Sequence, residues 1–412
     1  MLNQFKFVKS ILLFVSLFLL LFFRNTRIFT YPEPWIEDMM IFINQEYRTG
    51  FPDTIFIPYA GYLHLLPRFI TWFAMKFDPE NVMRVMNLSV MFIKLLIFYT
   101  IFKSKEINQI IKYPLLAYLI LLPFSDEIYN NVTNLQWWLI PFMAITIIKC
   151  EDSNKQVIFS VLVLLLTGLT GVNSILFAIP SIYLLCLVRT KKCLIKVITL
   201  IFCALIQFYY LYTSGRAGNG NILYTLTSVQ GGDIVNLFVI RVIYHTLFNF
   251  STENFINIII FLLYVFILTV NLWYYRKLAV IHFIFLFSVI YLTAIVCQVI
   301  KSEGIRWHIS TGFGGERYFV FLRICSFALF VSFLNILFKY ILRPRNYKRL
   351  MAYACFILCL ILLENYSINF KFEYQYYNDI ERFKASKSGE TVKIHFPPDY
   401  FTPGRSIDLT KK

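Results

Sequence analysis

The chain has 412 residues, of which 58% are hydrophobic and only 15% charged, with 44 Phe and 27 Tyr. This composition excludes a soluble globular domain and predicts a helical membrane protein, because each spanning helix needs about 20 mostly apolar residues. The net charge of +16 would suit nucleic-acid binding, but the Lys and Arg residues gather in short connections between apolar stretches. That distribution predicts that these connections face the cytoplasm, and we expect no nucleic-acid partner.

The apolar stretches predict an all-α polytopic membrane protein with about 10–11 transmembrane helices in a domain of residues 1–364. The first span covers roughly residues 9–24, with its amino end in the cytoplasm. No small-residue cleavage site follows it, so we expect an uncleaved span. The other single spans are expected near residues 83–103, 193–212, 255–274, 278–299, 319–339 and 349–363, and two more flank residues 125–131.

The first exported loop, residues 25–82, contains the stretch Trp35-Ile36-Glu37-Asp38. Its stretch from Tyr59 to Phe77 is amphipathic but is interrupted by Pro67 and Arg68, so we expect a helix lying at the membrane interface.

Residues 156–188 lie between Lys155 and Arg189, which are both cytoplasmic by the charge pattern. Their 33 residues would make about 50 Å of helix, whereas two full spans with a turn need more than about 60 Å. The stretch is broken at residues 167–171, Thr-Gly-Leu-Thr-Gly. We therefore expect a short or re-entrant helical hairpin with a cavity above its tip.

The polar tail, residues 365–412, is expected outside the membrane on the same side as the first loop. Residues 391–396 alternate between polar and apolar side chains, and Pro397-Pro398 follows, which predicts a strand.

The acidic pair Glu37 and Asp38 is the strongest candidate for catalysis. The aromatic and Met side chains around the pair, Trp35 among them, should press it against the membrane and raise its pKa into the range of a general base. The alternative is a pair of solvated loop acids, and Asp53 is the second choice of acid.

Arg317 follows a Gly-Gly turn and precedes a span, where its guanidinium could bind phosphate oxygens at the headgroup level. The alternative is an interfacial anchor beside Tyr318. Arg68 and Arg216 suggest the same role more weakly. Arg323 and Lys94 stand out because a charge within a span is costly and usually functional.

Several familiar sites are absent from the sequence. It has no P-loop, GxGxxG, HExxH or GxSxG motif, and its five histidines are dispersed, so we expect no nucleotide cofactor and no metal site. A hard divalent cation held by loop carboxylates stays an open alternative. We interpret Trp137 and Trp138 as part of an interfacial aromatic belt.

An exported acidic pair after the first span, interfacial helices in that loop, a broken helix and Arg317-Tyr318-Phe319 before a late span together resemble the GT-C class of membrane glycosyltransferases. Within that class, the size and the tail ending in Lys411-Lys412 resemble the serotype-converting O-antigen glucosyltransferases of enteric bacteria and their phages.

The resemblance implies transfer of a hexose, glucose in that subgroup, from undecaprenyl phosphate to a lipid-linked O-antigen or another surface glycan. The reaction would take place at the outer face of the bacterial inner membrane, during lipopolysaccharide biosynthesis. It also implies substrate-binding roles for Arg317 and for the terminal lysines, and pathway partners in a small flippase and a donor synthase. Trp35, Arg68, Tyr318 and Arg323 complete the expected substrate-binding residues.

Two other functions are open. An O-antigen polymerase would use the same membrane face, but would rest on paired Arg-rich exported loops that this chain lacks. A lipid-linked oligosaccharide flippase would need charges lining a central cavity, and few charges lie within the spans.

Overall fold

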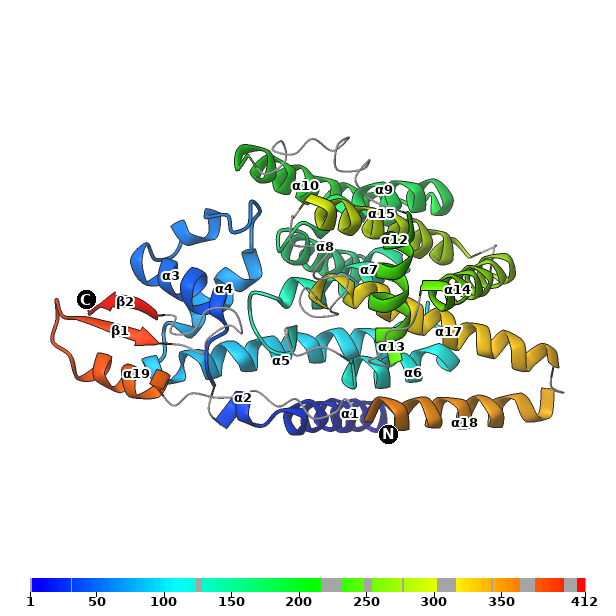
Figure 1. Ribbon diagram of the computed structural model, residues 1–412, viewed down its shortest axis with the longest axis horizontal. Coiled ribbons are helices and arrows are strands. Elements are labelled where there is room, and N and C mark those ends of the chain that lie inside the picture. The colour runs from blue at the N-terminus through cyan, green and yellow to red at the C-terminus, as the bar shows by residue number, and fades with distance from the viewer. Residues whose placement is uncertain are drawn as a thin grey trace.

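The computed structural model describes residues 2–30, 32–123, 128–215, 231–247, 254–275, 278–301, 316–341, 344–363, 375–395 and 406–411. The chain is mostly helical, and its long helices run roughly along the long axis of the molecule (Figure 1). Among the described residues, five helices are long and apolar enough to cross a membrane, namely Pro79–Lys103, Lys191–Thr213, Phe255–Tyr274, Glu316–Tyr340 and Asn346–Leu363. The predicted class, a helical protein with several apolar helices that could span a membrane, is confirmed.

Every apolar stretch that the sequence marked as a span or half of the hairpin is helical. These helices are α1 (Leu2–Arg24), α5 (Val82–Lys103), α6 (Gln109–Ile120), α7 (Leu135–Ile148), α8 (Asn154–Gly168), α9 (Asn173–Val188), α10 (Lys191–Thr213), α14 (Asn254–Tyr274), α15 (Ala279–Lys301), α17 (Val320–Ile341) and α18 (Pro344–Leu363). Large apolar side chains such as Leu205, Phe208 and Leu262 are more than half exposed on them. A soluble protein rarely exposes so much apolar surface, so these faces suit contact with lipid.

The predicted hairpin is present as α8 and α9. Ser153 caps α8 by accepting a hydrogen bond from the backbone N–H of Gln156, and Gly171 has a left-handed φ of +92° in the turn between the helices. The expected cavity above the tip is wrong, because the first loop covers it. The backbone of Leu63 accepts from the N–H of Gly171 at 2.9 Å, and His64 pairs with Thr170 in an isolated β-bridge.

The first loop is a series of short helices. They are α2 (Arg27–Thr30), the π-helix η1 (Asp38–Ile43), α3 (Asn44–Arg48), η2 (Asp53–Phe56), α4 (Leu65–Ala74) and η3 (Pro79–Asn81). The predicted amphipathic helix is α4, but Pro67 does not interrupt it. Pro67 lies in the first turn, where backbone N–H groups have no helical partner, so its missing N–H costs no hydrogen bond.

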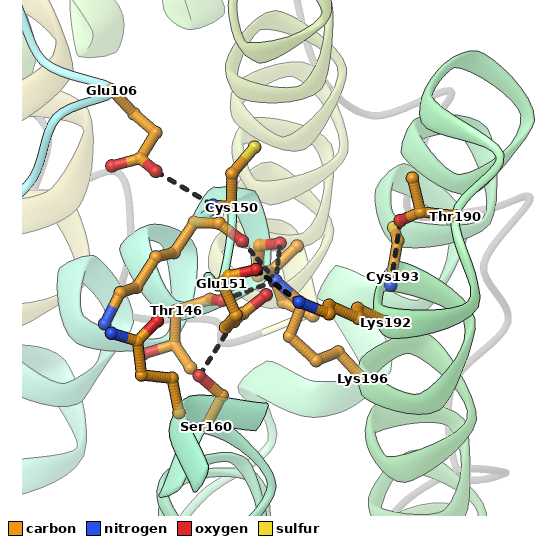
Figure 2. A network of polar contacts seen from close by, with 12 residues as sticks. Glu106, Thr146, Cys150, Glu151, Ser160, Thr190, Lys192, Cys193 and Lys196 are labelled. Atoms are coloured by element: carbon orange, nitrogen blue, oxygen red, sulfur yellow. Dashed lines mark hydrogen bonds and ion pairs between the residues drawn. The ribbon is translucent and has the colours of Figure 1, made fainter. Parts of the chain in front are cut away.

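A buried polar network joins α7, α8 and α10 (Figure 2). The ammonium of Lys196 forms a 3.0 Å ion pair with Glu151, and both side chains are at most 2% exposed. The same ammonium donates to three carbonyl groups at and just after the end of α7, at 2.6–3.2 Å. Glu151 also accepts from the hydroxyl of Ser160 at 2.9 Å. Lys196 therefore caps the carboxyl end of α7, where helix carbonyls have no partner of their own.

The remaining described elements are α12 (Gly231–Phe238), η5 (Val239–Tyr244), α13 (His245–Leu247), η6 (Glu316–Phe319), α19 (Gln375–Ala385), β1 (Thr391–His395) and β2 (Ser406–Thr410). The predicted strand is β1, which pairs antiparallel with β2. The hydroxyl of Tyr377 donates to the carbonyl of Pro32 at 2.9 Å, and Lys384 forms a 2.8 Å ion pair with Glu80. The described part of the tail therefore packs against the first loop, and both lie at one end of the molecule (left in Figure 1).

Candidate functional site

Asp38 is buried at the start of η1, with 0% of its surface exposed. One carboxylate oxygen accepts from the N–H of Val132 at 3.1 Å, and the other accepts from the N–H and the hydroxyl of Thr133 at 2.8 and 2.5 Å. Burial raises the pKa of Asp38 to about 6, although the hydrogen bonds from Thr133 and Val132 oppose this rise. The carboxyl group therefore ties the first loop to residues 132–133 and titrates close to neutral pH.

The segment that holds Asp38, residues 128–134, rests on buried cations. The ammonium of Lys94 donates to the carbonyl of Tyr129 and lies 4.0 Å from the centre of the Tyr129 ring and 4.5 Å from that of Trp138. The guanidinium of Arg24 lies 5.0 Å from the same Tyr129 ring. A cation over an aromatic face is attracted by the ring, and more strongly where water is excluded. Lys94, which the sequence marked as an unusual charge within a span, therefore stabilises residues 128–134, the segment that binds Asp38.

Glu37 differs from its neighbour because its side chain is only half-buried. Its Oε2 atom is buried without a hydrogen-bond partner in the described structure, and so is the indole Nε1 of Trp35. An unpaired buried polar atom costs about 1–3 kcal/mol. A substrate with hydroxyl groups would supply a donor to Glu37 and an acceptor to Trp35.

Trp137 connects the segment that holds Asp38 to Tyr318 and Arg317. Its indole N–H donates to the side-chain oxygen of Asn134 at 3.3 Å, and its ring meets the Tyr318 ring edge to face at 5.2 Å. Arg317 lies over the same Tyr318 ring, 5.2 Å from its centre. The sequence candidates Asp38, Arg317 and Tyr318 are therefore joined through residues 133–137.

The interpretation of Trp137 and Trp138 as a lipid-facing belt is wrong. Trp137 is 6% exposed and Trp138 1% exposed, and the N–H of Trp138 donates to the carbonyl of Ile128 at 2.9 Å. A polar N–H on a large apolar ring suits a buried packing site as well as an interface, so composition alone did not separate the two.

Arg323 belongs to a buried ionic cluster around Glu316. The carboxylate of Glu316 pairs with Arg241 and Arg323 and lies 3.4 Å from the ring nitrogen of His245. Arg323 also donates to the backbone carbonyl of Arg241 at 2.8 Å. Arg323 is fully buried, whereas Arg317 is half-buried. Of these two arginines, Arg317 is thus the better placed to meet a substrate.

Arg68 lies within the first loop. Its guanidinium donates to the side-chain oxygen of Gln45 at 2.5 Å and to the carbonyl of Ile57 at 3.1 Å, and it lies 4.9 Å from the centre of the Phe42 ring. Its Nε and Nη1 atoms are buried without partners in the described residues. Burial lowers the pKa of Arg68 to about 10, so it stays charged at neutral pH.

His64, beside Arg68, is fully buried among the rings of Phe42, Tyr59 and Tyr62. Burial, together with the charge of Arg68, lowers the pKa of His64 to about 3, so the imidazole is neutral. A buried neutral imidazole packed on aromatic rings serves the fold of the loop.

Of the two terminal lysines, Lys411 is bound within the tail. The ammonium of Lys411 donates to the carbonyls of Lys384 and Ser386, so it caps the end of α19. Lys412 and Arg216 lie outside the described residues. Within the described ranges, no three His, Cys, Asp or Glu side chains lie close enough to hold a metal ion.

Sequence patterns did not point to Thr133, Arg24, Arg241 or His245. The contact between Asp38 and Thr133 spans 95 positions, and a single sequence carries no signal for such a pairing. For Arg24, Arg241 and His245, the available signal was a charge or imidazole at the edge of an apolar stretch.

The chain was also compared with protein-family models and with curated protein sequences. No family model matches it, and no curated protein matches it. The description of the chain therefore rests on its own residues, as a mostly helical protein with several helices that could span a membrane.

Proposed function

We propose that this protein transfers a sugar from a polyprenyl-phosphate carrier to a lipid-linked glycan at the outer face of a bacterial cytoplasmic membrane. The observation that carries the proposal is the connection of a carboxylate pair, Glu37 and Asp38, to Arg317 through residues 133–137. A base and a cation are the two groups that such a transfer requires.

In this proposal Glu37 is the general base and Asp38 is a positioning residue. Both oxygens of Asp38 already accept hydrogen bonds from residues 132 and 133, and the group is fully buried. Glu37 has a carboxylate oxygen without a partner. A base must lie within hydrogen-bond reach of the proton that it takes, and Glu37 meets this condition more readily.

The chemistry is a single displacement. The acceptor hydroxyl gives its proton to Glu37 as its oxygen forms a bond to the anomeric carbon of the donor sugar. The bond from that carbon to the carrier phosphate breaks, and its electron pair leaves with the phosphate oxygen. Arg317 stabilises the developing phosphate charge, because a guanidinium forks onto such oxygens. Attack from the face opposite the phosphate inverts the anomeric centre.

The finer assignment rests on the resemblance alone. It makes the sugar a hexose such as glucose, the acceptor an O-antigen unit, and a small flippase and a donor synthase the partners in the pathway. The orientation, with the amino end in the cytoplasm and the first loop and tail in the periplasm, rests on the distribution of Lys and Arg.

A flippase is the weaker alternative, because few charges lie within the spans and two of these charges, Lys94 and Arg323, have protein partners. Lys94 is bound to the carbonyl of Tyr129, and Arg323 is bound to Glu316 and to the backbone of Arg241. Charges that are engaged in this way are less available to bind a substrate that crosses the membrane.

The decisive experiment is mass spectrometry of lipopolysaccharide repeat units from an O-antigen-positive host with and without the gene. A hexose-sized mass increase per repeat at unchanged chain length would support the transferase. Unchanged repeat mass with altered chain length would indicate a polymerase, and no change in either would remove the proposal.

The same assay tests whether Glu37 is the general base. We expect Glu37→Gln to lower transfer by about 100-fold or more, as loss of a general base does, while the protein remains abundant in the membrane. Asp78→Asn is the matched control, because Asp78 is an exposed acid of the same loop that was not a candidate for catalysis. Normal transfer by Glu37→Gln would remove Glu37 from the mechanism.

A further inference from the structure

The first loop contains an open cavity of about 310 Å³ that is separate from the acidic pair. Its lining includes Glu46, Tyr47, Phe51, Trp72 and Lys76. The Phe51 and Trp72 rings lie 4.6 Å apart, and the ammonium of Lys76 lies 5.5 Å from the centre of the Trp72 ring. Partly exposed aromatic rings beside a carboxylate and an ammonium offer both a stacking surface and hydrogen-bonding groups, which is what a sugar requires.

Three contacts of Glu46 and Tyr47 hold this cavity in shape. Glu46 accepts a 2.5 Å hydrogen bond from the hydroxyl of Thr54, which fixes the orientation of its carboxylate. Tyr47 donates to the carbonyl of Thr410 in β2 at 2.7 Å, and its ring packs on Phe383 of α19. The described part of the tail thus fixes one wall of the cavity.

A second cavity, lined almost entirely by apolar side chains, also borders helix α4. It measures about 570 Å³ and is lined by α1, α4 and α5 and by the turn after α4, with Phe14, Phe18, Phe73, Phe77, Leu88 and Phe92 among its residues. Phe73, Phe77 and Phe92 are each about half exposed. An apolar groove on a helix face that suits contact with lipid has the chemistry to accommodate a hydrocarbon chain.

Helix α4 and the turn after it form a wall shared by the two cavities. Phe73 and Phe77 face the apolar groove, whereas Trp72 and Lys76 face the polar cavity. Neighbouring residues of a helix point about 100° apart at 3.6 residues per turn, so an amphipathic helix can line two surfaces at once. Lys76 is exposed at this boundary, where the phosphate of a lipid-linked sugar would lie.

We propose that these two cavities bind one molecule, the lipid-linked glycan acceptor, with its polyprenyl chain in the apolar groove and its sugars in the cavity at Trp72. This inference rests on the proposed function and adds the acceptor site to it. Residues 38–48 form one continuous helical segment from η1 through α3. Glu46 follows Glu37 by nine residues, about two helical turns, which places it roughly 10 Å further along the axis. One sugar cannot reach both, so the cavity holds a part of the acceptor other than the reacting residue.

Binding of the acceptor can be measured apart from transfer. The probes are an undecaprenyl diphosphate-linked repeat unit isolated from an O-antigen-positive host and undecaprenyl phosphate without a glycan. Both are titrated against the full-length protein in detergent by native mass spectrometry. We expect the glycan-bearing lipid to bind more tightly, and Trp72→Ala to weaken its binding about tenfold, as loss of one aromatic contact does.

Three variants control the measurement. Trp72→Phe keeps a ring and should retain most of the binding. Phe56→Ala removes an aromatic side chain of the same loop that is 62% exposed and should leave binding unchanged. Leu88→Trp fills the apolar groove and should weaken binding of both lipids.

Equal binding of the two lipids, or wild-type binding by Trp72→Ala, would overturn the acceptor site. Trp72-dependent binding without any transfer by the wild-type protein would keep the site and remove the proposed transferase. Transfer whose acceptor KM does not depend on Trp72 would keep the transferase and remove this site.

Discussion

Glu37 and Asp38 are neighbours in the chain but have different surroundings. Asp38 is fully buried and bonded to residues 132 and 133, whereas Glu37 is half-buried with an unpaired oxygen. Adjacent helical residues point in different directions, so the protein binds one carboxylate of the pair and leaves the other without a hydrogen-bond partner at one oxygen. The sequence identified the pair, and the contacts distinguish the two roles.

The pKa of Asp38 predicts a pH dependence both of stability and of the proposed transfer. Its folded pKa of about 6 lies above the ordinary value of 3.8, so the folded chain binds more protons than the unfolded chain between these values. The contribution of protonated Asp38 to the free energy of unfolding is therefore complete below pH 4 and is lost as pH rises through 6. Ionisation of the buried carboxyl group lowers the free energy of unfolding by about 3 kcal/mol. Transfer, which depends on the ionised group holding residues 132–133, should fall below about pH 6.

Thr133→Val tests this assignment. The hydroxyl of Thr133 lowers the pKa of Asp38, so its removal should move the acidic limb of the pH–rate profile to higher pH. Thr199→Val serves as a control, since the Thr199 hydroxyl donates only within its own helix. An acidic limb at the same pH in Thr133→Val and the wild type would contradict the role of Asp38.

At the scale of elements, short segments at and between helix ends hold distant parts of the chain together. Residues 63–66 cover the hairpin tip, and residues 128–137, which run into the first turn of α7, join the first loop to η6 through Asp38 and Tyr318. Loops positioned by a rigid helical scaffold are where functional groups usually lie.

The hairpin turn depends on Gly171. A Cβ atom at this position would lie 2.3 Å from the side-chain oxygen of Gln136, and the backbone is left-handed. Gly171→Ala should therefore lower the thermal midpoint in detergent more than Gly389→Ala does. Gly389 has a similar φ of +88° but nothing within 4 Å, so it reports the backbone strain alone, about 1–2 kcal/mol. Equal shifts for both variants would contradict the close packing at Gln136.

The network in Figure 2 should be a main support of α7, α8 and α10. Lys196→Met leaves Glu151 buried without its cation, and loss of one partner of a buried ion pair costs about 3–5 kcal/mol. Lys105→Met is the control, because Lys105 pairs with Asp152 at 3.2 Å while both are mostly exposed, and exposed pairs contribute little. Similar midpoints for the two variants in thermal unfolding would refute this role.

At the scale of the whole molecule, the first loop and the described tail form one unit at one end of the helices (Figure 1). Tyr47, Tyr377 and Lys384 connect them. Their contact requires both to lie on the same side of the membrane, which agrees with the sides predicted from the Lys and Arg distribution.

Reporter fusions test this orientation. Alkaline phosphatase, which folds only outside the cytoplasm, should be active when fused after Lys411 and inactive when fused after Lys105. The reverse pattern would invert the predicted topology and would place the Glu37 site in the cytoplasm.

The sequence by itself determined the helical membrane class, the helical stretches, the break at residues 167–171 and the strand at residues 391–395. These features follow from local composition and periodicity, which the chain carries within 20 to 30 residues. It also identified Glu37, Asp38 and Arg317 as candidates, because charges are conspicuous where most residues are apolar.

Only the tertiary structure decided which of these residues meet. The covering of the hairpin tip, the burial of Trp137, the cluster of Arg241 and Arg323 around Glu316 and the cavity at Trp72 all join segments distant in sequence. A buried polar group must find its partner wherever the fold brings one, and a single sequence does not record that partner.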